Sequence, residues 1–137
     1  MASREVFVDT SGLYALIDRK DAHHSAAREA VERLARAGRR LIVTDYVIDE
    51  TVTLAYRRSG ERVALRVLDL IDQSVGIRVE WIEETRFNAA KSYFRRHSDH
   101  AYSFTDCASF VVMRELELRE ALTTDRDFRE AGFDPLL

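Results

Sequence analysis

The sequence contains few of the residues that build disulfide-rich, collagen-like or disordered chains: one cysteine, one proline and five glycines among 137 residues. The single cysteine, Cys107, excludes an intrachain disulfide and a cysteine-rich zinc site, and it is typical of a reducing compartment. No run approaches the roughly 20 apolar residues of a membrane-spanning helix. Asp9 interrupts the apolar run near the N-terminus, so no secretory signal peptide is expected. These absences predict a cytoplasmic protein without a membrane segment.

The remaining composition is that of a globular domain. Hydrophobic residues make up 46% of the chain, which at this length suffices for an ordinary core. No internal repeat, low-complexity segment or linker divides the sequence. We therefore expect one domain that spans residues 1–137.

The charge of the chain is slightly negative overall but unevenly distributed. The formal net charge is −3, and nearly all positive charge is arginine, because Lys20 and Lys91 are the only lysines. Three groups of arginines stand out: Arg36, Arg39 and Arg40; Arg57, Arg58 and Arg62; Arg95 and Arg96. Guanidinium groups bind phosphate in a bidentate manner. Two interpretations stay open, namely a solvated helix surface or phosphate-binding rims around an acidic site.

Short, unbroken apolar runs predict strands that are buried on both faces, as in a parallel sheet. Two such runs are Val6–Val8 and residues 41–43, and further strands are expected at residues 77–82 and 121–123. Amphipathic periodicity predicts helices at about residues 11–17, 23–37, 45–58, 61–73, 85–96 and 103–118, followed by a tail with a turn and a small edge strand. This alternation predicts right-handed crossovers and a three-layer α/β/α sandwich with a central parallel sheet of four or five strands.

Four carboxylates occupy positions where an acidic side chain requires a structural or functional explanation. Asp9 and Asp125 each follow a buried strand, at the edge of the sheet where open α/β proteins bind ligands. Glu50 shares an inward helix face, and Asp106 opens a helix in line with its apolar stripe, where an unpaired acid is costly. A structural Glu50 would require an arginine partner. Asp106 and Asp125 each have a simpler structural alternative. An acid such as Asp106 near a helix N-terminus interacts favourably with the helix dipole, and aspartate is common in turns such as the one expected at Asp125.

Convergence of these four acids would require a cation. Two unit charges about 4 Å apart repel by roughly 4 kcal/mol at an effective dielectric constant near 20. Ligation by oxygen alone favours a hard ion such as Mg²⁺ or Mn²⁺. Such an ion polarises a phosphoryl oxygen and lowers the pKa of a bound water. The predicted chemistry is phosphodiester cleavage.

Four short segments surround these acids in order along essentially the whole chain. They are Val6-Phe-Val-Asp9-Thr-Ser11, Thr44-Asp-Tyr-Val-Ile-Asp-Glu50, Ser103-Phe-Thr-Asp106-Cys-Ala108 and Leu122-Thr-Thr-Asp125-Arg-Asp-Phe128. Their order closely resembles that of the PIN-domain ribonucleases, and more narrowly that of the VapC-type toxins of bacterial toxin–antitoxin pairs. The resemblance implies a metal-dependent endoribonuclease that cleaves cellular RNA.

The resemblance also implies roles for particular residues. Asp9, Glu50, Asp106 and Asp125 would be the catalytic acids and would hold one or two Mg²⁺ ions, for which Mn²⁺ can substitute. Asp127 is a substitute for Asp125 or an addition to it.

Supporting residues and partners follow from the same resemblance. Thr10 or Ser11 would support Asp9 by hydrogen bonding, and Thr124 would lie beside the metal site. The family further implies a homodimer, an RNA substrate and a cognate VapB-like antitoxin that blocks the active groove. The helix at 61–73 carries more apolar residues than one core face needs, which favours it as a dimer or antitoxin contact.

The polar stretch at residues 95–100 is a second place to expect RNA contacts. Arg95, Arg96 and His97 would touch RNA if this loop lies beside the acidic edge of the sheet. The alternative is an ordinary solvated loop, since no cysteine or other metal-ligand motif accompanies its histidines.

Two other functions compete with ribonuclease activity. An aspartate-nucleophile phosphatase also places an aspartate after its first strand, but it requires a second acid two positions later, where this chain has Ser11. A non-catalytic PIN-type RNA-binding or regulatory module would bind RNA without metal. It would not require four mutually repelling acids.

Overall fold

The computed structural model describes residues 4–137. Five strands, all parallel to their neighbours, form one sheet in the order β3-β2-β1-β4-β5. Their bounds are β1 Val6–Val8, β2 Leu41–Thr44, β3 Ile77–Glu80, β4 Glu120–Leu122 and β5 Asp134–Pro135. The chain winds outward from β1 in both directions, so the strand order reverses between β1 and β4. Such a switch point opens a crevice at the carboxyl ends of the strands.

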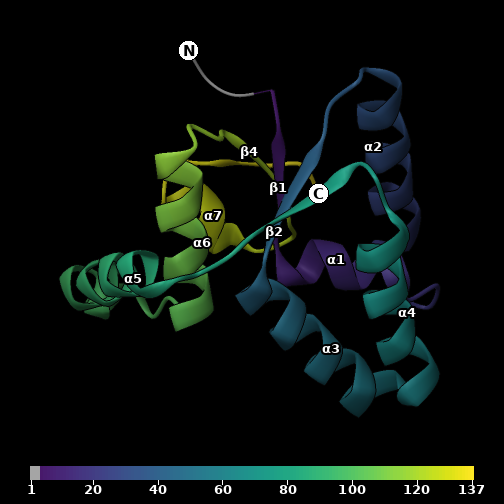
Figure 1. The fold of residues 1–137 in the computed structure, drawn as a ribbon, viewed down its shortest axis with the longest axis horizontal. Coiled ribbons are helices and arrows are strands. Elements are labelled where there is room, and N and C mark those ends of the chain that lie inside the picture. The colour runs from purple at the N-terminus through teal and green to yellow at the C-terminus, as the bar shows by residue number, and fades with distance from the viewer. Residues whose placement is uncertain (1–3) are drawn as a thin grey trace.

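In the part of the chain that the structure describes, seven α-helices flank the sheet, and a short 3-10 helix, η1 (Ser98–His100), follows α5. The bounds of the α-helices are α1 Thr10–Ile17, α2 His24–Arg36, α3 Asp45–Ser59, α4 Glu61–Gln73, α5 Glu84–Arg96, α6 Phe104–Glu115 and α7 Arg126–Glu130. The helices α1 to α4 lie on one side of the sheet, and α5 to α7 lie on the other (Figure 1). The predicted three-layer sandwich with a parallel sheet is confirmed. None of the helices within residues 4–137 has the length and apolar character needed to cross a membrane.

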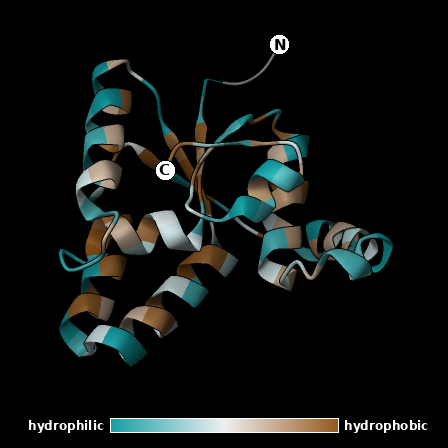
Figure 2. Cartoon of the chain, turned by 180° about the vertical axis from the view of Figure 1, so that it is seen from behind, coloured by the Kyte–Doolittle hydropathy of each residue, from teal (hydrophilic) through white to brown (hydrophobic). Residues whose placement is uncertain are grey.

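The central strands supply the middle of the core. All three residues of β1 are buried, with Val6 and Phe7 fully inaccessible. Phe110 of α6 and Phe128 of α7 pack edge to face beneath them, with ring centroids 4.9 Å apart. The central strands β1 and β2 are mainly hydrophobic, whereas the outer helices alternate between hydrophobic and hydrophilic residues (Figure 2). The unbroken apolar runs of the sequence therefore correspond to strands covered on both faces.

A single glycine lets α1 approach the sheet closely. A Cβ atom on Gly12 would lie 2.0 Å from the backbone oxygen of Leu122 in β4. No side chain fits in that space, so only glycine permits this contact. The close approach places the residues at the start of α1 beside those that follow β4.

Two local expectations were wrong. The helix expected from about residue 11 begins one residue earlier, at Thr10, and Asp9 occupies its N-cap position. The tail was expected to form a turn, but it forms the short helix α7, whose N-cap Asp125 accepts a hydrogen bond from the amide of Asp127. Five residues are too few to produce a detectable helical period. The expected edge strand is β5.

Candidate active site

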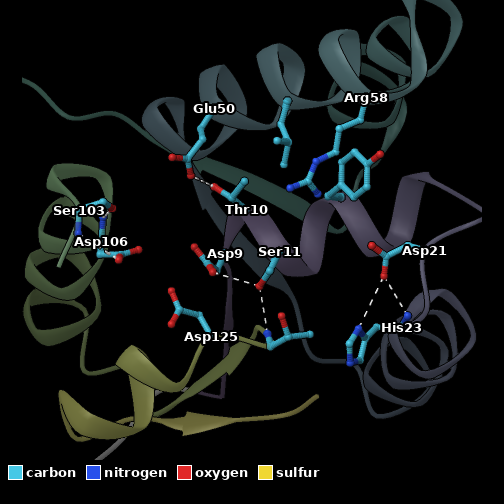
Figure 3. A pocket seen from close by; sticks show the side chains of 13 residues that line it. Asp9, Thr10, Ser11, Asp21, His23, Glu50, Arg58, Ser103, Asp106 and Asp125 are labelled. Carbon is cyan, nitrogen blue, oxygen red and sulfur yellow. Dashed lines mark hydrogen bonds and ion pairs between the residues drawn. The ribbon is translucent and has the colours of Figure 1, made fainter. Parts of the chain in front are cut away.

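A pocket of about 440 Å³ opens at the carboxyl ends of β1 and β4, at the switch point of the sheet. It is lined by Asp9, Thr10, Ser11, Tyr14, Asp21, His23, Glu50, Leu54, Arg58, Ser103, Asp106, Thr124 and Asp125. The four acids expected from the sequence all belong to this lining. They come from different parts of the chain and point toward a common centre (Figure 3).

Asp9 lies at the bottom of the pocket, directly after β1, and is 3% exposed. Its Oδ2 accepts hydrogen bonds from the hydroxyl of Thr123 at 2.8 Å and from that of Ser11 at 3.2 Å. Burial is the main reason that the pKa of Asp9 rises to about 6, and the nearby charge of Asp125 adds to it, although the two hydroxyl donors lower it. A cation bound nearby would favour the ionised form of this carboxyl group.

Thr123 is a supporting residue that sequence reasoning missed. It is fully buried, and besides contacting Asp9 its hydroxyl accepts the amide of Asp125 at 3.0 Å. The neighbouring Thr124, which the family pattern indicated, lines the pocket and donates its amide to the hydroxyl of Ser11. The sequence did contain a signal for Thr123. Side chains alternate between the two faces of an extended chain, so Leu122 and Thr123 point to opposite faces.

Asp106 faces Asp9 from the first turn of α6 and is buried. It forms a capping box with Ser103: the Ser103 hydroxyl accepts the Asp106 amide at 3.0 Å, and the Asp106 carboxylate accepts the Ser103 amide. Burial, and then the charges of Asp9 and Asp125, raise the pKa of Asp106 to about 7. Asp106 thus has a structural role in the first turn of α6, where an acid also interacts favourably with the helix dipole, but this role does not account for the other acids around it.

The carboxylates of Asp125 and Asp127 lie close to each other and to that of Asp106. Each offers a carboxylate oxygen within 4.8 Å of the others in a three-acid cluster with Asp106. Asp125 lines the pocket, whereas Asp127 approaches the cluster from α7. Burial and the charge of Asp125 raise the pKa of Asp127. Both acids are thus available to the same cation.

Glu50 lines the pocket from α3 but remains exposed to solvent. The expectation of an inward face is right in direction, since Leu54, one turn later, lines the same pocket. Within residues 4–137 no arginine pairs with Glu50, as a purely structural glutamate would require, and its exposed carboxylate accepts a hydrogen bond from the hydroxyl of Thr10. Thr10 therefore supports Glu50 with its hydroxyl, while Ser11 supports Asp9.

The three residues expected to touch RNA lie outside this pocket. Arg95 and Arg96 are exposed at the end of α5. The guanidinium of Arg96 lies over the ring of Tyr93, and the imidazole of His97 stacks on that ring at 4.1 Å between centroids. Their contact with RNA stays a prediction.

The lining includes other residues that the sequence did not single out as site residues. Asp21 and His23 follow α1 and are joined by a hydrogen bond from the His23 amide. Arg58 extends from the end of α3 into the pocket, on the side opposite Asp106 and Asp125 (Figure 3). The arginine cluster around position 58 was the available signal, but the sequence alone could not distinguish it from solvated surface.

The donor set fits a hard divalent cation. All candidate ligands are carboxylate oxygens, which Mg²⁺ and Mn²⁺ prefer. Burial is the main cause of the raised pKa values of Asp9, Asp106 and Asp127, and the charges of neighbouring carboxylates add to it, so a bound cation would stabilise their ionised forms. Cys107, next to Asp106, is fully buried and its thiol pKa is raised to about 11, which makes it a packing residue and not a ligand.

The chain is similar to known proteins over nearly its whole length. The PIN domain family model matches residues 6–134. The 23S rRNA-specific endonuclease VapC20 of Mycobacterium tuberculosis is 37% identical over 129 residues, covering 93% of this chain and 95% of the relative. The crystal structure of that VapC20, a Sarcin-Ricin loop cleaving toxin, superposes with a TM-score of 0.83 at 36% identity, over 93% and 95% of the two chains.

More distant structures share the fold alone. VapBC2 from Rickettsia felis bound to a promoter DNA fragment gives a TM-score of 0.72 at 9% identity, over 96% of both chains. FitAcB from Neisseria gonorrhoeae gives 0.65 at 12% identity, over 95% of both. With the match of the family model and the close relative together, the chain belongs to the PIN domain family.

Proposed function

We propose that this protein is a metal-dependent endoribonuclease of the VapC type, with Mg²⁺ as its cofactor and Mn²⁺ as a substitute. The observation that carries the proposal is the convergence of Asp9, Glu50, Asp106 and Asp125 on one pocket at the switch point of the sheet. The 37% identity to a 23S rRNA-specific endonuclease supports the same reaction.

The carboxylates have two different tasks in this proposal. Asp9, Asp106, Asp125 and Asp127 hold the cation, since they are the acids whose charges act on one another. A bound divalent cation polarises a phosphoryl oxygen and lowers the pKa of a coordinated water. Glu50 stands apart on α3, open to solvent and oriented by Thr10, where its carboxylate accepts a proton from water in the pocket.

The proposed substrate is cellular RNA, and large-subunit ribosomal RNA is the first substrate to test. VapC20 is named for cleavage of 23S rRNA, and this chain covers 95% of its length. Most of the residues that line the pocket are polar or charged, and Leu54 is the only aliphatic residue among them. Such a site relies on the folded shape of its RNA and on contacts to the sugar–phosphate backbone.

A regulatory partner and self-association complete the proposal. A VapB-like antitoxin would block the pocket and keep the toxin inactive. The chain would act as a homodimer in the cytoplasm. Co-expression with the product of a small neighbouring reading frame, followed by size-exclusion chromatography with light scattering, tests both partners in one experiment.

The decisive experiment compares RNA cleavage by the purified protein with Mg²⁺, with Mn²⁺ and with EDTA. We expect cleavage with either metal, none with EDTA, and loss of more than about 100-fold in rate for Asp9→Asn. Asp49→Asn is the matched control, because Asp49 is an exposed acid on α3 outside the pocket lining. Sequencing of the cleaved ends in total RNA identifies the substrate.

A different outcome would point to the non-catalytic alternative. A PIN-type RNA-binding module would bind RNA with equal affinity with and without metal and would yield no cleavage products. Full activity of Asp9→Asn would also contradict the proposal. The phosphatase alternative loses further support from Ser11, whose hydroxyl donates to Asp9 where that chemistry requires a second acid.

A further inference from the structure

A second hollow adjoins the acidic pocket where the end of α3 meets the start of α4. It has a volume of about 590 Å³. Its lining comprises Asp18, Arg19, Lys20, Arg58, Ser59, Arg62, Val63 and Arg66. Five of these eight residues are cationic and one is anionic. We call the five cations, Arg19, Lys20, Arg58, Arg62 and Arg66, the arginine groove.

The cations of the groove outnumber the one carboxylate that lines it. Within residues 4–137, none of the five forms an ion pair, whereas Arg78 in β3 contacts two carboxylates at 2.8 Å each. The one carboxylate in the lining, Asp18, accepts the hydroxyls of Tyr14 and Ser59 at 2.7 and 2.9 Å and the amide of Lys20 at 2.9 Å. The groove therefore presents a net positive surface.

Arg58 joins the groove to the acidic pocket, because it lines both. Its guanidinium points into the pocket from the side opposite Asp106 and Asp125 (Figure 3). An elongated anionic ligand with one group between Arg58 and these acids would continue directly into the groove. A bound cation at the acids would make that position favourable for a phosphate.

The direction of Arg58 is set by its neighbours. Its guanidinium carbon lies 5.5 Å from the centre of the Tyr14 ring, within the range of a cation–π contact. Tyr14 is buried and is held by hydrogen bonds between its hydroxyl and both Asp18 and Ser59. An arginine that is already oriented loses less side-chain freedom when it binds a ligand.

We propose that the arginine groove binds the backbone phosphates of the RNA strand next to the bond that is cleaved. The proposal rests on the ribonuclease function above and adds the path that the RNA takes out of the pocket. Unpaired arginines are suited to phosphate contacts, which fix the register of a nucleic acid. A protein ligand would call for an apolar centre, but Val63 is the only aliphatic side chain among the eight lining residues.

The test measures binding of a fluorescein-labelled single-stranded RNA to the full chain by fluorescence anisotropy, with Asp9→Asn present in every variant to prevent cleavage. The groove variant carries Arg58→Ala, Arg62→Ala and Arg66→Ala. The control variant carries Arg33→Ala, Arg36→Ala and Arg40→Ala; these arginines are exposed, form no ion pair within residues 4–137 and lie outside both hollows. Both variants lose the same charge, so a difference between them reports position and not net charge.

We expect the groove variant to bind RNA at least about tenfold more weakly than the control variant, to a similar degree for different RNA sequences. The slope of log affinity against log salt concentration should decrease by about 2, since each lost contact to a single strand accounts for about 0.7. Arg58→Lys alone should recover only part of the affinity lost in Arg58→Ala, because lysine keeps the charge but not the planar fork.

Equal RNA binding and equal salt slopes for the two triple variants would contradict the proposal that the arginine groove binds RNA. So would a groove variant that cleaves RNA normally with its Asp9 restored but no longer binds the antitoxin, because the surface would then serve a protein. Failure of the ribonuclease function gives a distinct result: the unmodified chain would not cleave RNA with metal, whatever the groove does.

Discussion

The hydroxyl of Thr123 donates a 2.8 Å hydrogen bond to Oδ2 of Asp9 across 114 residues of sequence. This contact joins the ends of the two strands that flank the switch point, so it fixes the deepest acid of the pocket relative to Asp125. The hydroxyl lowers the pKa of Asp9, in opposition to burial. Thr123 is thus a positioning residue for the acidic cluster.

Replacement of Thr123 by valine should reduce RNA cleavage by about 10- to 100-fold, as is usual for residues that orient metal ligands. Loss of the hydroxyl raises the pKa of Asp9 further, so a higher pH should restore part of the activity. Cleavage rates between pH 6 and 9 at saturating and subsaturating Mn²⁺ provide the measurement.

The matched control for that substitution is Thr51→Val. Thr51 is also fully buried, but its hydroxyl donates to the backbone oxygen of Val47 within α3. It should lose stability without a change in the pH dependence of cleavage. Identical pH profiles for the two variants would remove the proposed role of Thr123.

Glu50→Gln should abolish most cleavage while leaving the fold nearly unchanged. The side chain is exposed, so its free energy of unfolding should change by less than about 0.5 kcal/mol. Thr10→Val should reduce cleavage less, because it frees Glu50 without removing the carboxylate. Metal affinity, measured by calorimetry, should stay within a few-fold of the unmodified chain in both variants. A large loss of Mn²⁺ binding in Glu50→Gln would instead make Glu50 a ligand.

Asp125→Asn and Asp127→Asn should both weaken Mn²⁺ binding, since both carboxylates reach the cluster with Asp106. Asparagine still caps a helix N-terminus, so α7 should persist in Asp125→Asn. We expect losses of about 10- to 100-fold in affinity for each, with Asp72→Asn, an exposed acid of α4, as control. Normal Mn²⁺ affinity in Asp127→Asn would assign the position to Asp125 alone. Electron paramagnetic resonance of free Mn²⁺ measures the affinity directly.

The sequence predicted features that depend on local pattern. The apolar run at residues 6–8 predicted a buried strand, and β1 is buried at all three positions. The apolar stripe at residues 61–73 predicted a helix, and α4 has the same bounds. Asp9 and Asp125 were found because parallel strands bring their carboxyl ends to one edge of the sheet. These inferences require only periodicity and topology.

The sequence could not reveal contacts that depend on the packing of distant segments. Thr123 and Ser11 share one oxygen of Asp9 only because Gly12 lets α1 approach β4 closely. Arg58 differs from the other clustered arginines because it lines both the acidic pocket and the arginine groove, and this position depends on the fold. No local pattern encodes such a position.

The acidic cluster also predicts how stability depends on pH. The pKa of Asp9 rises from 3.8 to about 6, and that of Asp106 from 3.8 to about 7. Between pH 4 and 7 the metal-free folded state therefore binds more protons than the unfolded state, so stability falls as the pH increases. For Asp9 alone the shift corresponds to about 3 kcal/mol, at 1.36 kcal/mol for each pKa unit.

Thermal unfolding of the metal-free protein should thus show a melting temperature that decreases from pH 5 to pH 8. Asp9→Asn should flatten this decrease and melt higher than the unmodified chain at pH 8, because it removes the buried charge. Mn²⁺ should raise the melting temperature of the unmodified chain more at pH 8 than at pH 5, since at low pH it competes with protons. A melting temperature that rises with pH in EDTA would mean that the acids do not repel one another, and the proposed cation site would lose its physical basis.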